Sequence, residues 1–456
     1  MTDPAPGTLS RLAPADWLRR LYAGALTVFV PAPDRPIRPA GVALAAGGVM
    51  LGTAVGLVRQ PGIGAFDTVW AEDGQVFLSG AVDKGLPGAI ATPYAGYYHL
   101  VPRLLAEFAA LFGPGSVPAV FAVESTLCTA LAGLLVYVAS GALLPGVLSR
   151  LLVSAVVVVM PLANEVPDSI ANLHWIGLYA VFWVLVWSPR GVAGRIVGVA
   201  VIGLVAGSDI LVLGYLPLAL LRASHRLPDG RRDRYGLLLA GVLGTGLAIQ
   251  IAGLLLGSSS RPLSPNPVPV VTGVVLRVVP STLIGEQWLG ADPHHARWLA
   301  LTALAWLLLA VAILAAVRRW TRPIWPLALI AGLHCVGLYA LPVMLEGLAI
   351  PRYAAAPVML LVTALVAALQ PAPEVARQPT VAPLHVLTAL LALVWLANLR
   401  VVDNTRGEGP RWSDQLRQAR VACAGAPAGT RIALPIPPRD DTPPWRANLP
   451  CRYLQR

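Results

Sequence analysis

The chain has 456 residues, of which 56% are hydrophobic and only 12% are charged, and its mean hydropathy is +0.68. Soluble proteins carry about 25% charged residues, so this composition excludes a large soluble core and indicates many transmembrane helices. The net charge is +11 and the isoelectric point is about 10.0. In a soluble protein this charge would suggest nucleic acid, but in a membrane protein the positive-inside rule places arginines in cytoplasmic loops. We therefore expect the lipid bilayer as a partner and no nucleic acid.

The N-terminal segment, residues 1–39, lacks the basic start, apolar centre and small-residue cleavage site of a signal peptide. Within it, Trp17 to Val30 is apolar but too short to span a bilayer, and Arg19 and Arg20 interrupt it. This pattern predicts an interfacial helix on the cytoplasmic surface.

Apolar segments of near-membrane length follow one another over residues 40–399. A membrane-spanning helix needs about 20 apolar residues. Eleven segments meet or approach this length: 40–58, 117–138, 147–162, 170–187, 194–207, 209–221, 235–256, 299–316, 323–343, 353–369 and 381–399. The sequence therefore predicts an all-α polytopic membrane protein with about eleven transmembrane helices.

Two of these segments, 194–207 and 209–221, are short for a full crossing. Arginines precede the first segment and follow the second, so both outer ends are expected at the cytoplasmic face. We expect the chain to reverse its direction near Asp209, as in a pair of half-depth helices.

The same charge rule gives the protein a cytoplasmic N-terminus and an extracytoplasmic C-terminus in the cell membrane. The transmembrane domain then covers residues 40–399. The segments expected on the outer side are 59–116, 163–169, 257–298, 344–352 and the tail 400–456.

The four cysteines fall into two classes. Cys128 and Cys335 lie within apolar segments and are expected to be inert packing residues. Cys423 and Cys451 lie in the proline-rich tail. If the tail is extracytoplasmic, a disulfide between them would stabilise a segment too small to build its own core. The alternative is two unrelated free thiols.

The first outer loop places three acids, Asp67, Glu72 and Asp73, among aromatic residues. Carboxylates are costly in a chain of membrane helices, so this cluster is a candidate functional site. On a helical turn Asp73 would share one face with Trp70 and Phe77, and this apolar setting would raise its pKa toward that of a general base. The alternative is that Asp73 caps a short helix that begins after it.

The same loop continues with Tyr94, Tyr97 and His99, and then with an amphipathic stretch from about Leu100. Tyrosines are common at membrane interfaces because their rings have one polar edge. We expect a helix that lies on the outer surface. Arg103 could clamp a phosphate there, or it could pair with a glutamate four residues later.

A first span, a long outer loop with the acid pair WAEDG, surface helices and many further spans together resemble the GT-C superfamily of integral-membrane glycosyltransferases. The resemblance implies a polyprenyl-phosphate-linked sugar as donor and a cell-envelope glycan or lipid as acceptor. It implies Glu72 or Asp73 as the catalytic base. It also implies an arginine-bearing outer loop before a late span, which IPRYAAAP, with Arg352 and Tyr353, resembles. Many members have Asp-Glu where this chain has Glu-Asp, so the choice of base stays open.

The residues expected to bind substrate around this base are Asp67, Tyr94, Tyr97, His99, Arg103, His174, Arg352 and Tyr353. His174 belongs to a second outer cluster, NEVPDSIANLHW, which also contains Asn164, Glu165, Asp168 and Asn172. A polar cluster between two spans is otherwise a solvated loop. Asp209 could line the same cavity, or it could cap the next helix.

No cofactor motif such as a Walker sequence or GxGxxG is present. His294 and His295 lie in a loop with Glu286 and Asp292, and this group could bind a divalent cation. We expect no other cofactor.

The main alternative function is a transporter or flippase of a lipid-linked or anionic substrate, which half-depth helices and outer arginines would suit. Few ionisable residues lie within the apolar segments, whereas a proton-coupled pump should carry more of them. A non-catalytic partner in a cell-envelope complex is a third hypothesis, against which the acid pair argues.

Overall fold

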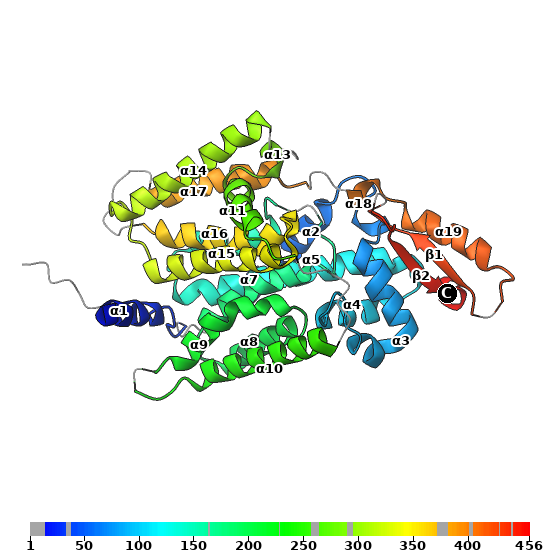
Figure 1. The fold of residues 1–456 in the computed structure, drawn as a ribbon, viewed down its shortest axis with the longest axis horizontal. Helices are drawn as coiled ribbons and strands as arrows, with labels where there is room; N and C mark the ends of the chain where they lie inside the picture. Colours follow the sequence, from blue (N-terminus) through cyan, green and yellow to red (C-terminus); the bar gives the residue numbers. More distant parts are fainter. Residues whose placement is uncertain are drawn as a thin grey trace, which may run out of the picture.

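The computed structural model describes residues 14–32, 38–162, 165–227, 229–256, 264–289, 295–371, 382–400, 405–427, 429–438 and 441–456. The chain is 72% helical, and its described residues contain one two-stranded sheet. The prediction of an all-α protein is therefore confirmed (Figure 1).

Six helical segments are long and apolar enough to cross a membrane. They are α2 (Pro39–Val58), Pro114–Ala142 around α5 (Val117–Ala139), α10 (Arg234–Leu256), α14 (Ala296–Val317), α15 (Trp325–Glu346) and Pro351–Ala368, which contains α16 (Ala355–Ala368). The shorter apolar segments are α6 (Val147–Val158), α7 (Leu173–Val186), α8 (Val192–Ala206), η5 (Ile210–Tyr215) with α9 (Leu216–Ser224), Val268–Leu283 and α17 (Pro383–Ala397). These helices indicate a multi-pass membrane protein, and the number of eleven spans stays a prediction.

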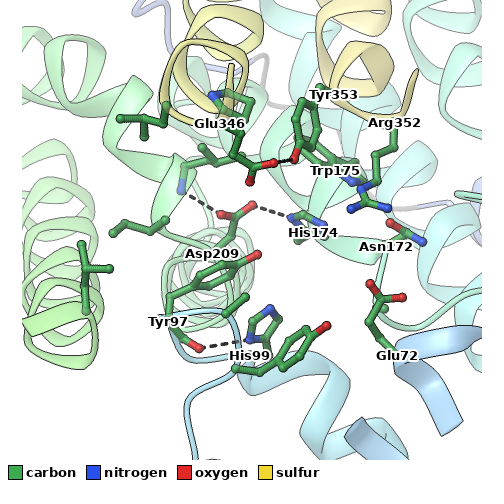
Figure 2. Close-up of a pocket in the computed structure, with 18 of the residues that line it drawn as sticks. Glu72, Tyr97, His99, Asn172, His174, Trp175, Asp209, Glu346, Arg352 and Tyr353 are labelled. Atoms are coloured by element: carbon green, nitrogen blue, oxygen red, sulfur yellow. Dashed lines mark hydrogen bonds and ion pairs between the residues drawn. The ribbon is translucent and has the colours of Figure 1, made fainter. Parts of the chain in front are cut away.

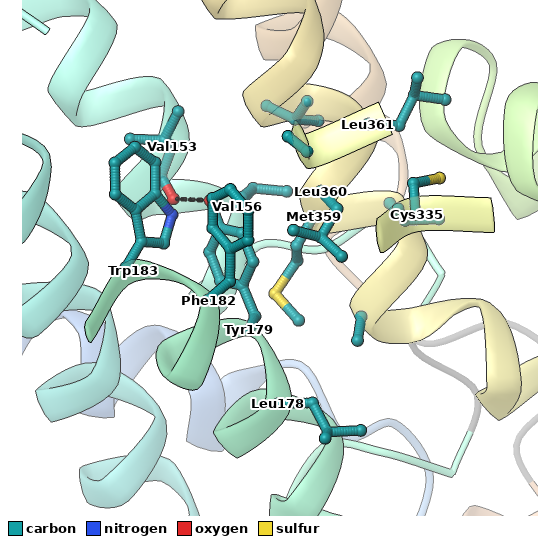
Figure 3. Close-up of a cluster of buried hydrophobic side chains, with 14 of the residues drawn as sticks. Val153, Val156, Leu178, Tyr179, Phe182, Trp183, Cys335, Met359, Leu360 and Leu361 are labelled. Atoms are coloured by element: carbon teal, nitrogen blue, oxygen red, sulfur yellow. Dashed lines mark hydrogen bonds between the residues drawn. The ribbon is translucent and has the colours of Figure 1, made fainter. Parts of the chain in front are cut away.

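Helix α7 lies at the centre of the membrane domain. Its sequence, LHWIGLYAVFWVLV, is apolar on almost every side, as a helix with neighbours all around requires. It packs against α5, α8 and α16. The Tyr179 hydroxyl donates to the Val153 carbonyl of α6 at 2.8 Å and lies 2.8 Å from the Thr363 hydroxyl of α16 (Figure 3). These contacts fix the helix, and with it the His174 side chain on its first turn.

The chain reverses its direction near Asp209, as predicted. At the start of α8, Ser188 accepts a hydrogen bond from the Ala32 amide at 2.9 Å. At the end of α9, Ser224 accepts one from the Tyr22 hydroxyl of α1 (Pro14–Leu26) at 2.7 Å. Both distal ends therefore meet the N-terminal segment, and Asp209 lies at the opposite end of the pair.

The segment predicted as the outer loop 257–298 is largely helical where it is described. It contains α11 (Val268–Gly273), η6 (Val274–Val278), α12 (Val279–Leu283) and α13 (Glu286–Leu289). The two ends of this segment meet neighbouring connections, since the Asn266 amide donates to the Met344 carbonyl and the Glu286 amide to the Pro161 carbonyl. The chain thus enters and leaves this helical segment on the same side of the membrane domain. The sequence showed no sign of this helix because prolines interrupt its apolar run.

The first outer loop and the tail build a second hydrophobic core together (Figure 1). The loop supplies η1 (Ala65–Asp67), η2 (Asp73–Leu78), α3 (Ser79–Ile90), η3 (Pro114–Ser116) and α4 (Leu100–Ala110). The tail supplies α18 (Thr405–Glu408), α19 (Trp412–Cys423), the antiparallel strands β1 (Arg431–Pro435) and β2 (Arg446–Pro450), and α20 (Cys451–Leu454). Phe77 from the loop and Leu416 and Leu449 from the tail belong to this core. We call the assembly of loop and tail the outer head, after the side of the membrane on which the sequence predicts it. The tail is thus part of a larger unit.

A disulfide joins Cys423 and Cys451, the pair singled out from the sequence. It connects the end of α19 to the start of α20 across 28 residues. Cys128 and Cys335 are free thiols, one half-buried and one buried.

Removing the disulfide is expected to loosen the tail. Closing a loop of this length stabilises a folded chain by about 3–4 kcal/mol in the chain-entropy estimate. The double variant Cys423→Ser/Cys451→Ser should therefore be cut in the tail much faster than wild type under limited proteolysis. Cys128→Ser, which removes a free thiol, is the control and should leave the cleavage rate unchanged. Equal rates for all three proteins would show that the disulfide does not stabilise the tail.

Candidate functional site

A cavity of about 360 Å³ lies where the first outer loop meets the membrane domain. Its walls come from the loop over residues 72–99, from the first turn of α7, from the reversal at Asp209, from the end of α15 and from η7 (Pro351–Ala354). Figure 2 shows acidic, basic and aromatic side chains from these five segments directed toward one space. Segments far apart in the sequence therefore build one polar site.

Seven of the predicted site residues line this cavity. They are Glu72, Tyr94, Tyr97, His99, His174, Arg352 and Tyr353. Three others, Asp67, Asp73 and Arg103, are absent from its lining.

The two adjacent acids have different environments. Glu72 is half-buried and lines the cavity, where Figure 2 shows it below Asn172 and Arg352. Asp73 is only 1% exposed and accepts hydrogen bonds from the Ala171 amide at 2.8 Å and the Ser169 hydroxyl at 3.3 Å. Successive residues of a helical turn point about 100° apart, which separates the two carboxylates.

The geometry favours neither of the two roles predicted for Asp73. Its hydrogen bonds run to Ser169 and Ala171, outside the helical turn that follows it, and it does not line the cavity. It instead secures the segment 168–172, which leads into α7 and its cavity residues. The apolar setting predicted for it is present, since Trp70 and Phe77 are also buried. Burial raises the pKa of Asp73 from 3.8 to about 7, although the Ala171 amide and the charge of Arg406 oppose the rise.

Arg103 is a structural residue beneath the cavity. Its guanidinium donates to the Val76 carbonyl at 2.9 Å and the Thr92 carbonyl at 3.3 Å, and it lies 5.0 Å from the centre of the Phe77 ring. Its phosphate-clamping role stays a prediction that this geometry does not favour, because the side chain does not line the cavity and Nη1 and Nη2 bind the loop's own backbone. Burial lowers its pKa, while the charge of Glu107 acts in the opposite direction.

Asp67 holds the tail and not a substrate. Its carboxylate accepts hydrogen bonds from the Ser413 amide at 2.8 Å and the Ser413 hydroxyl at 2.9 Å, at the start of α19. An acid at a helix N-terminus satisfies free backbone amides and interacts well with the helix dipole. The sequence could not reveal this role, because the two residues lie 346 positions apart.

His174 and Asp209 form a close polar pair in the cavity. His174 Nδ1 lies 2.6 Å from Asp209 Oδ2, while the other oxygen, Oδ1, accepts the Leu211 amide at 2.8 Å. Asp209 thus both lines the cavity and caps η5, the two roles considered from the sequence. The carboxylate fixes the orientation of the imidazole ring.

On the opposite wall, Arg352 and Tyr353 are each held by an acid. Arg352 Nη1 donates to Glu165 Oε1 at 2.8 Å, and the Tyr353 hydroxyl donates to Glu346 (Figure 2). The Tyr353 ring packs 5.5 Å from that of Trp175. Sequence reasoning missed Glu346 and Trp175. An acid placed directly before the arginine-bearing loop was the available signal for Glu346.

Aromatic rings form the floor of the cavity. The Tyr97 and His99 rings stack with centroids 4.2 Å apart, and His99 Nδ1 lies 3.2 Å from the Tyr97 carbonyl. A tight turn through Ala95 and Gly96, with φ of 52° and 89°, brings Tyr94 back beside His99. Stacked planar rings of this kind suit contact with the apolar face of a sugar.

A metal site is not formed by the described part of the chain. No three histidine, cysteine, aspartate or glutamate side chains gather there in a group that could hold an ion. His295 accepts the Arg297 amide at the start of α14, and Glu286 lies 3.6 Å from Arg277. The remaining members of the predicted cation group, Asp292 and His294, lie outside the described residues, as does Asn164.

A scan of the chain against models of known protein families found no match, and a search of curated proteins found no similar sequence. The relation to GT-C enzymes therefore stays a hypothesis that rests on the site.

Asp73 gives a pH-dependent contribution to stability that can be measured. Because its pKa is higher in the folded protein than its ordinary value of 3.8, folding favours the protonated form. This contribution is complete below about pH 4 and is lost as the pH rises through about 7. The variant Asp73→Asn, which is always neutral, should therefore gain thermal stability relative to wild type between about pH 5 and pH 8.

The measurement is the difference in Tm between variant and wild type across this range. Asp83→Asn, which removes a surface carboxylate paired with Arg431, is the control, and its difference should stay constant. A constant difference for Asp73→Asn as well would contradict the raised pKa.

Proposed function

We propose that this protein is a membrane glycosyltransferase of the GT-C type, which moves a sugar from a polyprenyl-phosphate donor to a cell-envelope glycan or lipid. One observation carries the proposal: the carboxylate of Glu72 and the guanidinium of Arg352 line the same cavity at the edge of the membrane domain. The first could accept a proton and the second could bind a phosphate.

Glu72 is the proposed general base. As the acceptor hydroxyl attacks the anomeric carbon, its proton passes to the Glu72 carboxylate, and a new carbon–oxygen bond forms. The bond between the anomeric carbon and the phosphate oxygen breaks, and polyprenyl phosphate leaves with its negative charge. Arg352 neutralises this charge through its two-pronged donor geometry. Among the adjacent acids, accessibility to the cavity favours Glu72 over Asp73.

The remaining cavity residues suit recognition of a sugar. The ring stack of Tyr97 and His99 offers an aromatic surface, and the pair of His174 and Asp209 offers an oriented donor for a hydroxyl. The acid Glu346 and the Tyr353 hydroxyl add a further acceptor and donor on the facing wall.

An apolar groove of about 600 Å³ supports a lipid-linked substrate. It lies between α4, α5, α7 and α8, and its walls include Leu131, Val138 and Val201. The groove shares His174 with the polar cavity. A hydrocarbon chain in this groove would therefore end beside the proposed reaction centre. In this proposal the cavity faces the outside of the cell membrane, the chain crosses the bilayer eleven times, and the N-terminus is cytoplasmic.

Replacing the proposed base should slow transfer strongly. For Glu72→Gln we expect kcat to fall by about 10²–10⁴-fold, the usual contribution of a general base. Asp73→Asn should lose far less, because its carboxylate does not line the cavity. The assay is sugar transfer from a polyprenyl-phosphate donor by purified protein, with Glu107→Gln as a control in the same loop. Full activity of Glu72→Gln would rule out this base.

Arg352 should act mainly on the donor. We expect Arg352→Gln to raise the donor KM by about tenfold, the loss of one strong phosphate contact, and Arg352→Lys to recover part of it. The acceptor KM should change little in either variant. Melting temperatures close to that of wild type would show that the loss of the Glu165 pair does not unfold the site. An unchanged donor KM in Arg352→Gln would contradict the phosphate role.

The alternative function is a transporter or flippase of a lipid-linked substrate, and the junction of groove and cavity is the observation that favours it. Reconstituted liposomes distinguish the two functions. Movement of lipid-linked sugar across the bilayer without formation of a glycosidic product would support the transporter.

A further inference from the structure

A second, strongly basic cleft lies at the end of the molecule opposite to the candidate site. It has a volume of about 680 Å³ and lies between the starts of α8 and α10, the end of α9 and the N-terminal segment near Phe29. Six arginines line it: Arg190, Arg195, Arg222, Arg231, Arg232 and Arg234. Helix α8, with 15 residues, separates the cleft from the reversal at Asp209 by about 22 Å. Figure 1 shows α1 and α9 far from α3 and the tail.

Arg222 forms the inner wall of this cleft and is only 1% exposed. Its Nη2 donates to Asp233 Oδ2 at 2.7 Å, and its guanidinium lies 4.8 Å from the centre of the Phe29 ring. The Nε and Nη1 atoms are buried without an acceptor among the described residues. A buried donor without a partner is costly, so a built site for an anion would account for it.

Both carboxylate oxygens of Asp233, the acid beside Arg222, already have partners. Asp233 is the one acid among the cleft's described lining residues. Its Oδ1 accepts the Tyr235 and Gly236 amides, each at 3.1 Å, at the start of α10. Its Oδ2 takes the Arg222 guanidinium. A second acid, Asp229, pairs with Arg231 of the cleft at 3.0 Å. The six arginines outnumber these two acids, so the field in the cleft stays positive.

The positive-inside rule accounts for arginines near a cytoplasmic membrane surface, but it requires neither a cleft nor a buried guanidinium. Helix α8 also begins near this cleft, and the N-terminal end of a helix favours negative charge. The start of α10 is already capped by Asp233. Phosphate groups match both features, because arginine donors pair with phosphate oxygens in a fixed geometry.

We propose that this cleft binds a phosphate group, and that the headgroup of an anionic membrane lipid supplies it. The lipid source follows from the neighbouring helix α1, whose Trp17, Leu18 and Leu21 side chains are exposed as in a helix that lies in the membrane interface. The Tyr22 hydroxyl of α1 bonds Ser224, and Phe29 packs against His225 of the cleft, so the cleft lies at the level of α1. This site does not depend on the proposed glycosyl transfer.

The experiment uses the full chain in detergent, prepared without phosphate, and measures binding by calorimetric titration. The probes are short-chain phosphatidic acid, short-chain phosphatidylcholine and inorganic phosphate. Wild type should bind phosphatidic acid saturably and more tightly than the other two. The variant Arg190→Gln/Arg195→Gln, which changes two exposed residues of the rim, should weaken this binding by about tenfold or more.

The matched control is Arg318→Gln/Arg319→Gln, which removes two exposed arginines from the connection after α14 and should bind as wild type does. Tight binding of inorganic phosphate with the same dependence on Arg190 and Arg195 would support the site and assign it to a soluble phosphate compound. Absence of saturable binding by every probe, or equal weakening in both double variants, would overturn the proposal. Arg222→Gln tests the buried donor directly wherever its Tm shows that it folds.

Discussion

A buried arginine of the tail, Arg406, connects three segments that lie far apart in the sequence. Arg406 is 3% exposed, and its Nε donates to the Thr68 hydroxyl at 2.9 Å while its Nη1 donates to the Asp168 carbonyl at 2.7 Å. Burial raises the pKa of Asp168 to about 6, and the charges of Arg406 and Arg59 oppose this rise. A buried guanidinium is stable only when its donors find acceptors. Arg406 therefore joins the first loop, the segment before α7 and the tail into one unit.

The candidate site depends on this unit. Asp73 connects the first loop to the segment that leads into α7, and Asp67 connects the same loop to the tail. Their neighbour Glu72 lines the cavity. Arg352, which comes from a late part of the membrane domain in the sequence, lines the same cavity. The buried contacts of Asp67 and Asp73 thus hold the backbone around Glu72 in place. The order Glu-Asp in WAEDG corresponds to two environments. The Glu72 side chain lines the cavity, and the Asp73 side chain is buried in the protein.

Much of the fold could be predicted from the sequence, because a membrane-spanning helix needs a long apolar segment, which the sequence shows directly. The reversal at Asp209 also followed from the positions of flanking arginines. The site was predicted only in part. His174 stood out because polar residues interrupt the apolar segments at a predicted outer end, whereas Arg352 and Tyr353 were implied by the resemblance to an arginine-bearing loop. Contacts between distant segments could not be read in the same way.

Arg103 and Glu346 illustrate that limit. An arginine on an amphipathic helix bears no local sign that two backbone carbonyls of its own loop will take its donors. An acid at the end of an apolar helix bears no sign that a tyrosine seven residues later will fold back onto it. In both cases the tertiary fold determines the hydrogen-bond partner. The residue type indicates only that a buried polar side chain needs one.

The shared core of the outer head has a consequence for biosynthesis. A chain is made from its N-terminus, so the first loop leaves the ribosome long before the tail exists. Until the residues around Leu416 and Leu449 are made, Phe77 and Leu78 lack the part of their core that the tail supplies. Residues from the last tenth of the chain therefore complete the core that residues from the first quarter begin. Truncated chains that end after α17 would keep every membrane helix and still lack a folded outer head.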